Sequence, residues 1–172
     1  MIFRLIVWLV MIFGGTAAGF YLDGLWFGKV HNDFIFHAVS LIIGLLLLTL
    51  VIRISKNTGR TLARYGKKGK IKRGETNVLV KEGPYKYMRH PMHLGLMLFP
   101  FALAFIVGSP SFVIVVAPAE VIFMLIMIKL FEEPEAIEKF GEEYLEYKKN
   151  TPGFCFRLEC LKELWKSVPK RK

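Results

Sequence analysis

Acidic residues are scarce in this 172-residue chain, where 14 Asp and Glu stand against 24 Lys and Arg and leave a formal net charge of +10. Charge of either sign is almost absent from four long stretches, at residues 5–22, 34–52, 92–107 and 112–131. More than half of the chain, 53%, is hydrophobic, and a soluble domain of this size has no use for so much apolar surface. The composition therefore excludes an ordinary soluble globule.

The uncharged stretches predict membrane spans, because a bilayer core about 30 Å thick needs about 20 apolar residues in a helix. Residues 34–52 and 112–131 meet this requirement directly. Residues 5–22 meet it when interfacial residues are counted, whereas 92–107 is short. The sequence "GSPS" at 108–111 predicts a tight hairpin between the last two spans. We therefore expect an all-α fold, an integral membrane helical bundle with about four transmembrane helices.

Signals for metal binding and for secretion are also sparse. The chain has two cysteines, Cys155 and Cys160, and their spacing is not a zinc pattern. We place them on the cytoplasmic side, where thiols stay reduced. Arg4 and the "GGTAAG" within the first apolar run could belong to a signal peptide, but one Arg is a thin n-region and the run is long.

The basic residues are concentrated in one loop. Residues 53–90 hold twelve Lys and Arg and two Glu, whereas 23–33 holds Lys29 against two Asp. The positive-inside bias places the first loop and both termini in the cytoplasm, and the second loop outside. We interpret "KKGKIKR" at 67–73 as topogenic charge facing anionic membrane lipids. It lacks interleaved aromatic residues and the spacing of a phosphate loop, so we expect no nucleic-acid partner.

The segment 132–172 differs in kind, with nine Glu and nine Lys and Arg. Aromatic and apolar residues recur there at helical spacing: Ile137, Phe140, Tyr144 and Tyr147. Since Pro134 suits a first helical turn, we expect the last span to end near 131–133 and a cytoplasmic amphipathic helix to follow. Gly141 costs helix stability, which indicates close packing there. Alternatively this helix lies on the headgroups, with its tyrosines as interfacial anchors.

The stretch "YMRHPMHLG" at 87–95 places reactive side chains where the basic loop meets the third span. Pro91 disfavours helical geometry at His90 and suits the first turn of that span. The free N–H groups of this turn, with Arg89 beside them, predict an anion site able to take a carboxylate. Gly95 would let a ligand or a neighbouring helix approach the backbone.

Each of these residues also has a simpler interpretation. Arg89 could only snorkel to the interface, and His93 could be a core histidine. His90 and His93 with the Glu pair 132–133 could bind a metal, but they stand three residues apart with no sign of supporting ligands, so we predict no metal site. Glu120, inside the fourth span, is either functional or protonated and hydrogen-bonded within the bundle.

Two motifs together carry a family resemblance. "GPYKYMRHPMHLG" followed by "EEPEAIEKFGEEYLEYKK" resembles the isoprenylcysteine carboxyl methyltransferase family, which belongs to a larger set of integral-membrane methyltransferases that includes phospholipid methyltransferases. The resemblance covers residues 75–152. His93 replaces the Tyr that is usual in the first motif, and Ala136 replaces the Leu that usually follows the Glu pair.

The resemblance implies S-adenosylmethionine as methyl donor, bound on the cytoplasmic side outside any Rossmann domain, and a lipid-like or prenylated acceptor that enters from the bilayer. It implies one methyltransferase domain over 1–172, with its cofactor part at about 75–95 and 129–154. Arg89 and Glu133 are the candidate catalytic residues, and Arg89 and Lys129 are the candidates for acceptor binding. The candidate cofactor-binding residues are Asn77, Val78, Leu79, Val80, Tyr85, His90, Pro91, Met92, His93, Gly95, Glu132, Phe140 and Tyr144.

The acceptor group follows less directly from the residues. A carboxylate is already a nucleophile and needs only alignment and exclusion of water. An amine must be neutral, and a nearby His or Glu could remove its proton. We expect carboxyl O-methylation of an isoprenylcysteine-like substrate; the alternatives are N-methylation of a phospholipid amine, or a membrane scaffold without catalysis. No sequence feature indicates the oligomeric state.

Overall fold

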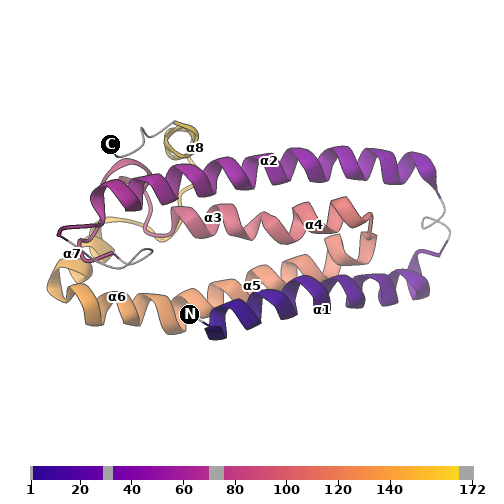
Figure 1. Cartoon of the computed structure of the whole chain (residues 1–172), viewed down its shortest axis with the longest axis horizontal. Coiled ribbons are helices and arrows are strands. Elements are labelled where there is room, and N and C mark those ends of the chain that lie inside the picture. Colours follow the sequence, from indigo (N-terminus) through magenta and orange to yellow (C-terminus); the bar gives the residue numbers. More distant parts are fainter. Residues whose placement is uncertain (1, 29–32, 70–75, 167–172) are drawn as a thin grey trace. The chain divides into compact units, whose positions relative to one another are not determined.

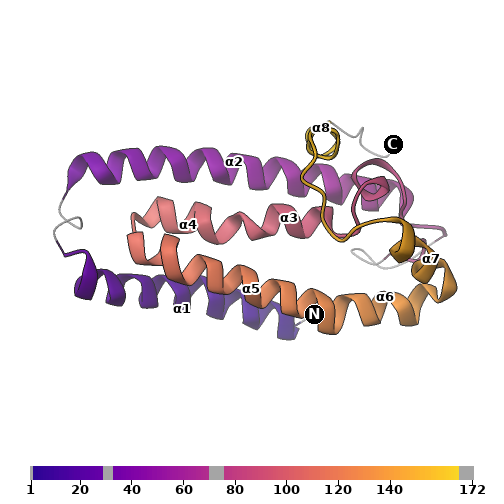
Figure 2. The ribbon, with the colours of Figure 1, turned by 180° about the vertical axis from the view of Figure 1, so that it is seen from behind.

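The computed structural model describes residues 2–28, 33–69 and 76–166, and these form helices and turns without a strand (Figures 1 and 2). Three helical stretches in this part of the chain are long and apolar enough to cross a membrane. They lie at Ile6–Trp26 within α1 (Ile2–Trp26), at Phe34–Tyr65, which is α2, and at Phe112–Phe140. The predicted all-α membrane helical bundle is confirmed.

The third predicted span is not one continuous helix. It consists of α3 (Pro91–Met97) and α4 (Phe99–Val107), separated at Leu98. Pro100 has no N–H to donate to the preceding turn, so the helical hydrogen-bond ladder is interrupted there. This apolar stretch is shorter than the other three, and the count of four spans stays a prediction.

The chain divides into two compact units. One comprises Met1–Leu50 and Met97–Ile126, and the other comprises Val51–Leu96 and Met127–Lys172. A single methyltransferase domain over the whole chain stays a prediction. All the polar residues that form the candidate site described below belong to the second unit.

The predicted hairpin at 108–111 is present in the first unit. Gly108 ends α4 in the left-handed conformation, with φ of 67°, which a residue without a Cβ adopts at no steric cost. Asp23 of α1 is buried, and its Oδ1 accepts a hydrogen bond of 2.8 Å from the Ser111 N–H in the first turn of the next helix. This carboxylate satisfies one of the N–H groups that a helix start leaves unpaired.

The last long helix runs further than the sequence indicates. α5 (Ala117–Met127) continues through a π-helical turn (Ile128–Glu132) into α6 (Glu133–Phe140), so the helix does not break near 131–133 as expected, and the end of the membrane span there stays a prediction. The reason is the π-helical turn, in which the Glu133 N–H bonds the Ile128 carbonyl five residues back. This wider turn allows Pro134, which has no N–H, to follow without breaking the helix.

The break falls instead at Gly141, between α6 and α7 (Glu142–Asn150). Gly141 has φ of 55° and ψ of −133°, a region open almost only to glycine. A Cβ there would meet no atom within 4 Å, so the close packing expected at this position is wrong. The glycine is needed for the turn, after which α7 takes a new direction.

We expect Gly141→Ala to lower the free energy of unfolding by about 1–3 kcal/mol, because alanine must adopt a strained backbone there. Gly59→Ala is the matched control. Gly59 lies inside α2 with a negative φ and open space around it, so its substitution should stabilise the protein by up to about 1 kcal/mol. Thermal unfolding in detergent measures both, and equal effects would contradict a conformational role for Gly141.

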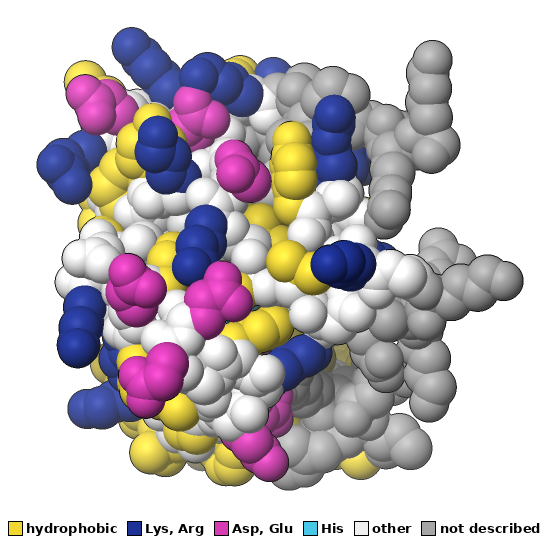
Figure 3. Space-filling view, turned by 90° about the vertical axis from the view of Figure 1, so that its left-hand side faces the viewer, with side chains coloured by type: hydrophobic (Ala, Val, Ile, Leu, Met, Phe, Trp, Pro, Cys, Tyr) yellow, Lys and Arg dark blue, Asp and Glu magenta, His cyan; other side chains and the backbone are white. Residues whose placement is uncertain are grey.

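The change of direction at Gly141 also divides the predicted apolar stripe. Ile137 and Phe140 on α6 are half-buried, whereas Tyr144 and Tyr147 on α7 are buried within the second unit, so they are not interfacial anchors. The outward side chains of α6 and α7 are charged, and acidic and basic groups stand intermixed on the face that carries these helices (Figure 3).

The two cysteines form a disulfide, so the expectation of reduced thiols is wrong. Cys155 and Cys160 have Cα atoms 6.0 Å apart and both are buried. Their separation of five residues closes a small loop between the segment after α7 and α8 (Leu158–Trp165). The disulfide thereby ties the start of α8 to the chain that leads into the candidate site.

Candidate active site

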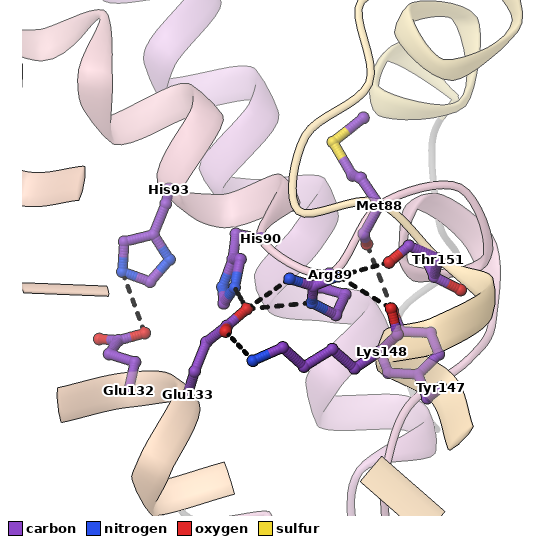
Figure 4. A network of polar contacts seen from close by, with 9 residues as sticks. All are labelled: Met88, Arg89, His90, His93, Glu132, Glu133, Tyr147, Lys148 and Thr151. Carbon is purple, nitrogen blue, oxygen red and sulfur yellow. Dashed lines mark hydrogen bonds and ion pairs between the residues drawn. The ribbon is translucent and has the colours of Figure 1, made fainter. Parts of the chain in front are cut away.

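Three segments of the second unit converge on one carboxylate, that of Glu133 at the start of α6 (Figure 4). Its Oε1 accepts hydrogen bonds from Arg89 Nη2 at 2.5 Å and Nε at 3.1 Å, and lies 3.2 Å from His90 Nε2. Its Oε2 accepts a hydrogen bond from Lys148 Nζ at 2.6 Å. The Glu133 side chain is 11% exposed, so this small volume holds a nearly buried carboxylate among three basic partners.

Arg89 connects this carboxylate to the end of α7. Its Nη1 donates to the carbonyl oxygens of Thr151 at 2.5 Å and Lys148 at 3.3 Å, while Nε and Nη2 face Glu133. The planar guanidinium suits such a divided task, because its donors point along fixed directions. The positive charge also stands at the C-terminus of α7, where the helix dipole favours a cation. In the structure, the carboxylate that meets Arg89 belongs to the protein itself.

The backbone that follows α7 fixes the same loop. The Arg89 N–H donates to the Pro152 carbonyl at 2.9 Å, and the His90 N–H donates to the Gly153 carbonyl at 3.1 Å. These two bonds leave the Arg89 and His90 side chains directed toward Glu133 (Figure 4). The segment 151–153 therefore holds the loop that precedes α3, and we call it the strap.

The neighbouring carboxylate has a different partner. Glu132 Oε2 lies 3.2 Å from His93 Nε2, one turn into α3 from His90, and these two side chains are 31% and 22% exposed. Two adjacent glutamates thus differ in environment: Glu133 is enclosed and Glu132 can be reached from solvent. His90, His93 and Glu132 also offer ligand atoms within 4.8 Å of one another, a geometry compatible with the metal-binding alternative.

Buried tyrosines pack behind the network. The Tyr147 hydroxyl donates to the carbonyl oxygens of Tyr85 and Met88, and the Tyr144 and Tyr147 rings meet edge to face at 6.1 Å. Burial raises the pKa of Tyr85, Tyr144 and Tyr147 above the usual value for a phenol. These hydroxyls remain neutral at physiological pH, and that of Tyr147 braces the loop 85–88.

His90 is held as a neutral imidazole. Burial lowers its pKa, and the hydrogen bond with Glu133 opposes this shift only in part. In unfolded chains a histidine takes up a proton at about pH 6.5. As the pH falls below that point the unfolded state binds a proton that the folded state resists, so stability should decrease with acidification.

Imidazole resonances followed by NMR in detergent should therefore show His90 titrating below about pH 6.5. His90→Gln would assign the signal and should weaken the loss of stability between neutral and mildly acidic pH. A His90 midpoint above about pH 6.5 would mean that the Glu133 carboxylate outweighs burial and would contradict a neutral His90.

The structure gathers part of the predicted site. Arg89, His90 and Glu133 meet in one network, His93 meets Glu132, and Tyr85 and Tyr144 pack nearby. Pro91 begins α3 as predicted. Gly95 adjoins α2, where a Cβ would lie 2.8 Å from Ile54 Cγ2, so a neighbouring helix makes the close approach.

Other predicted residues lie outside this network. The Asn77 side chain exchanges two hydrogen bonds of 2.8 Å with the Lys68 backbone and so fastens the loop to the end of α2. Lys129 is exposed on the π-helical turn, and Phe140 lies under the Lys139 ammonium. Of the remaining candidates, Val80 is buried and Val78, Leu79 and Met92 are half-buried. Their assignments to cofactor or acceptor stay predictions.

The sequence interpretation missed Lys148 and the strap. Lys148 stands in "EYKK" on α7, where a basic residue near a helix C-terminus has an ordinary explanation. "TPG" at 151–153 reads as a turn after a helix, and its carbonyl partners cannot be identified from the sequence. One feature of the sequence could have identified Lys148. It lies one turn after Tyr144, on the face of α7 that is buried.

The fold and the site together define a class of protein. It is a membrane protein of apolar helices whose site, centred on a carboxylate, lies where the apolar runs end. The chain matches the phospholipid methyltransferase family over residues 34–143, which is more than half of its length, and it belongs to that family. No solved structure matches it significantly.

Relatives with assigned names show which members of the family this chain resembles. The chain is 30% identical over 88 residues to the protein-S-isoprenylcysteine O-methyltransferase of Schizosaccharomyces pombe, and 34% identical over 88 residues to that of Saccharomyces cerevisiae. Each alignment covers 48% of this chain and 34% of the relative. The human protein of that name is 32% identical over 86 residues, covering 46% of this chain and 28% of its own length. The chain thus spans about a third of the curated relatives it matches. These findings confirm the resemblance that the motifs carry.

Proposed function

We propose that this chain is a membrane-embedded methyltransferase that uses S-adenosylmethionine and methylates the carboxylate of an isoprenylcysteine-like acceptor. The observation that carries the proposal is the pairing of the "RHP" loop with both glutamates at the end of the apolar helices. The similarity to protein-S-isoprenylcysteine O-methyltransferases favours a carboxyl acceptor over a phospholipid amine.

The donor set suits the proposed cofactor. Glu132 is partly exposed and ion-paired with His93, so its carboxylate can accept hydrogen bonds from ribose hydroxyls or stand beside a cationic centre. Glu133 is enclosed by Arg89, His90 and Lys148 and is better suited to holding the site in shape. When bound, S-adenosylmethionine would supply an activated methyl group.

The residues of the chain would then align and enclose the reactants. A carboxylate acceptor needs no general base, so catalysis would rest on orientation and exclusion of water. Lys129 is exposed beside the glutamate pair and could attract an anionic acceptor. A prenyl or other lipid tail would remain in the bilayer beside the apolar helices.

We further propose that this site faces the cytoplasm in a multi-pass membrane protein, where the buried Cys155–Cys160 disulfide of the same unit would have to persist in a reducing compartment. Residues 53–90, which comprise the end of α2 and the loop that leads into the site, carry twelve Lys and Arg against two Glu, and such an excess next to a membrane span keeps the segment on the cytoplasmic side. Anionic membrane lipids would then lie close to the same loop.

Calorimetric titration of the detergent-solubilised protein with S-adenosylhomocysteine, the expected product, tests the proposal. We expect binding by the unaltered chain, and Glu132→Gln should weaken it about tenfold or more, which is about 1.4 kcal/mol. Glu138→Gln, on an exposed turn of α6, is the matched control and should leave affinity unchanged. Absence of binding by the unaltered chain would favour a non-catalytic scaffold.

A further inference from the structure

The short helix α8 presents two apolar stripes, and only one of them is covered. Cys160 and Leu164 are each 2% exposed and pack into the second unit. Leu158, Leu161 and Trp165 are 76%, 41% and 48% exposed and form a second stripe beside the first. These three recur at i, i+3 and i+7, the spacing of one helix face. A helix in water gains nothing from three large apolar side chains on its surface.

Two contacts fix α8 at a defined level of α2. The Arg53 guanidinium lies 3.8 Å from the centre of the Trp165 ring, and Asn57 Nδ2 donates to the Leu164 carbonyl at 2.9 Å. Arg53 is the first Lys, Arg, Asp or Glu after the apolar run 34–52 of α2. The Trp165 ring therefore lies at the level where α2 leaves its apolar surroundings.

The direction of α8 also agrees with a position at the membrane surface. α8 is seen end-on in two views in which α2 runs across the picture (Figures 1 and 2), so the two helices lie crosswise. If α2 crosses a bilayer, a helix that lies crosswise to it and touches it at Arg53 runs along the membrane surface.

The charges around α8 also fit a position at the membrane surface. Lys162 borders the exposed apolar stripe, and Arg157 immediately precedes the helix, whereas Glu159 occupies another face. A shallow hollow of about 490 Å³ is lined by Leu158, Leu161, Lys162, Trp165 and Lys166. The Lys166 ammonium is paired with Glu163, and the Lys162 ammonium at the rim of these apolar walls matches a phosphate headgroup above an acyl chain.

We propose that α8 is an interfacial helix whose occupant is the phospholipid bilayer itself. Leu158, Leu161 and Trp165 enter the boundary between headgroups and acyl chains, and Arg53 and Lys162 meet lipid phosphates. The exposed Phe156, just before the helix, extends the apolar surface. This inference rests on α8 and α2 alone and is independent of any methyltransferase activity.

Fluorescence of Trp165 tests the proposal in the full chain. Trp8→Phe and Trp26→Phe leave Trp165 as the only tryptophan, and the protein is reconstituted into phosphatidylcholine vesicles with bromine at shallow or deep acyl positions. An interfacial helix sits about 5–10 Å inside the headgroup boundary. We expect blue-shifted emission, stronger quenching by shallow than by deep bromines, and little quenching by aqueous acrylamide.

Two variants on the same background supply the contrast. Leu161→Glu places a charge on the stripe and should shift emission to the red and increase acrylamide quenching. Glu159→Lys changes charge on another face of α8 and should leave both readouts unchanged. Quenching of the unaltered Trp165 by acrylamide but not by brominated lipid would overturn the proposal in favour of a water-exposed helix. Protection from both quenchers would overturn it in favour of a protein contact, such as a second copy of the chain.

Discussion

Glu133→Gln will lower the free energy of unfolding by about 3 kcal/mol and abolish most ligand binding. Removing one member of a buried ion pair leaves the other charge without compensation, at a cost of about 3–5 kcal/mol. We expect the low end of that range because the Lys148 side chain is 39% exposed and water can replace its partner. Arg89 is enclosed and has no such recourse. Thermal unfolding in detergent measures the change.

Glu143→Gln is the matched control for this prediction. Glu143 pairs with Lys81 at 3.0 Å, but both side chains are about half exposed, and such surface pairs contribute at most about 1 kcal/mol. If the two substitutions destabilised the protein equally, Glu133 could not be the centre of the network described above.

Arg89→Lys should preserve membrane insertion and yet cost about 1.5–3 kcal/mol, the range for a hydrogen bond to a charged group. An ammonium cannot donate to Glu133 and to the Thr151 carbonyl along the fixed directions of a guanidinium. The strap should loosen, and kcat/KM should fall by about ten- to a hundredfold, since each 1.4 kcal/mol is about tenfold.

Whether Arg89→Lys weakens cofactor binding or turnover identifies the role of Arg89. Weaker binding of S-adenosylhomocysteine would assign Arg89 to the cofactor side, whereas intact binding with poor turnover would assign it to the acceptor. Arg64→Lys, at an exposed turn of α2 beside Tyr65, should change neither stability nor activity. Full stability and activity in Arg89→Lys would reduce Arg89 to an interfacial anchor.

Sequence reasoning identified the helices and the centre of the site because both depend on local signals. Uncharged runs of sufficient length predict membrane helices whatever they pack against. Pro91 marks a helix start, and the "RHP" and "EE" motifs name Arg89, His90 and Glu133 without structural information. The same reasoning could not choose which glutamate faces the arginine, because that depends on the orientation of one helical turn.

The errors arose where hydrogen bonding departs from the regular helix. A π-helical turn at Ile128–Glu132 carries the chain past Pro134, and no residue in that turn announces it. The left-handed backbone at Gly141 was mistaken for a site of close packing, since both explanations favour glycine. The strap was missed because its contribution comes from carbonyl oxygens, which every sequence possesses equally.

The strap also determines when the site can exist during synthesis. The apolar helices are complete by residue 140, but the carbonyls of Pro152 and Gly153 that hold Arg89 and His90 belong to a segment made later. At about 5–20 residues per second, translation leaves an interval in which the inserted helices lack a formed centre. A chain that ends between α6 and the strap therefore has the apolar helices but lacks the carbonyl oxygens that hold Arg89 and His90. The network around Glu133 thus forms after the helices have entered the membrane.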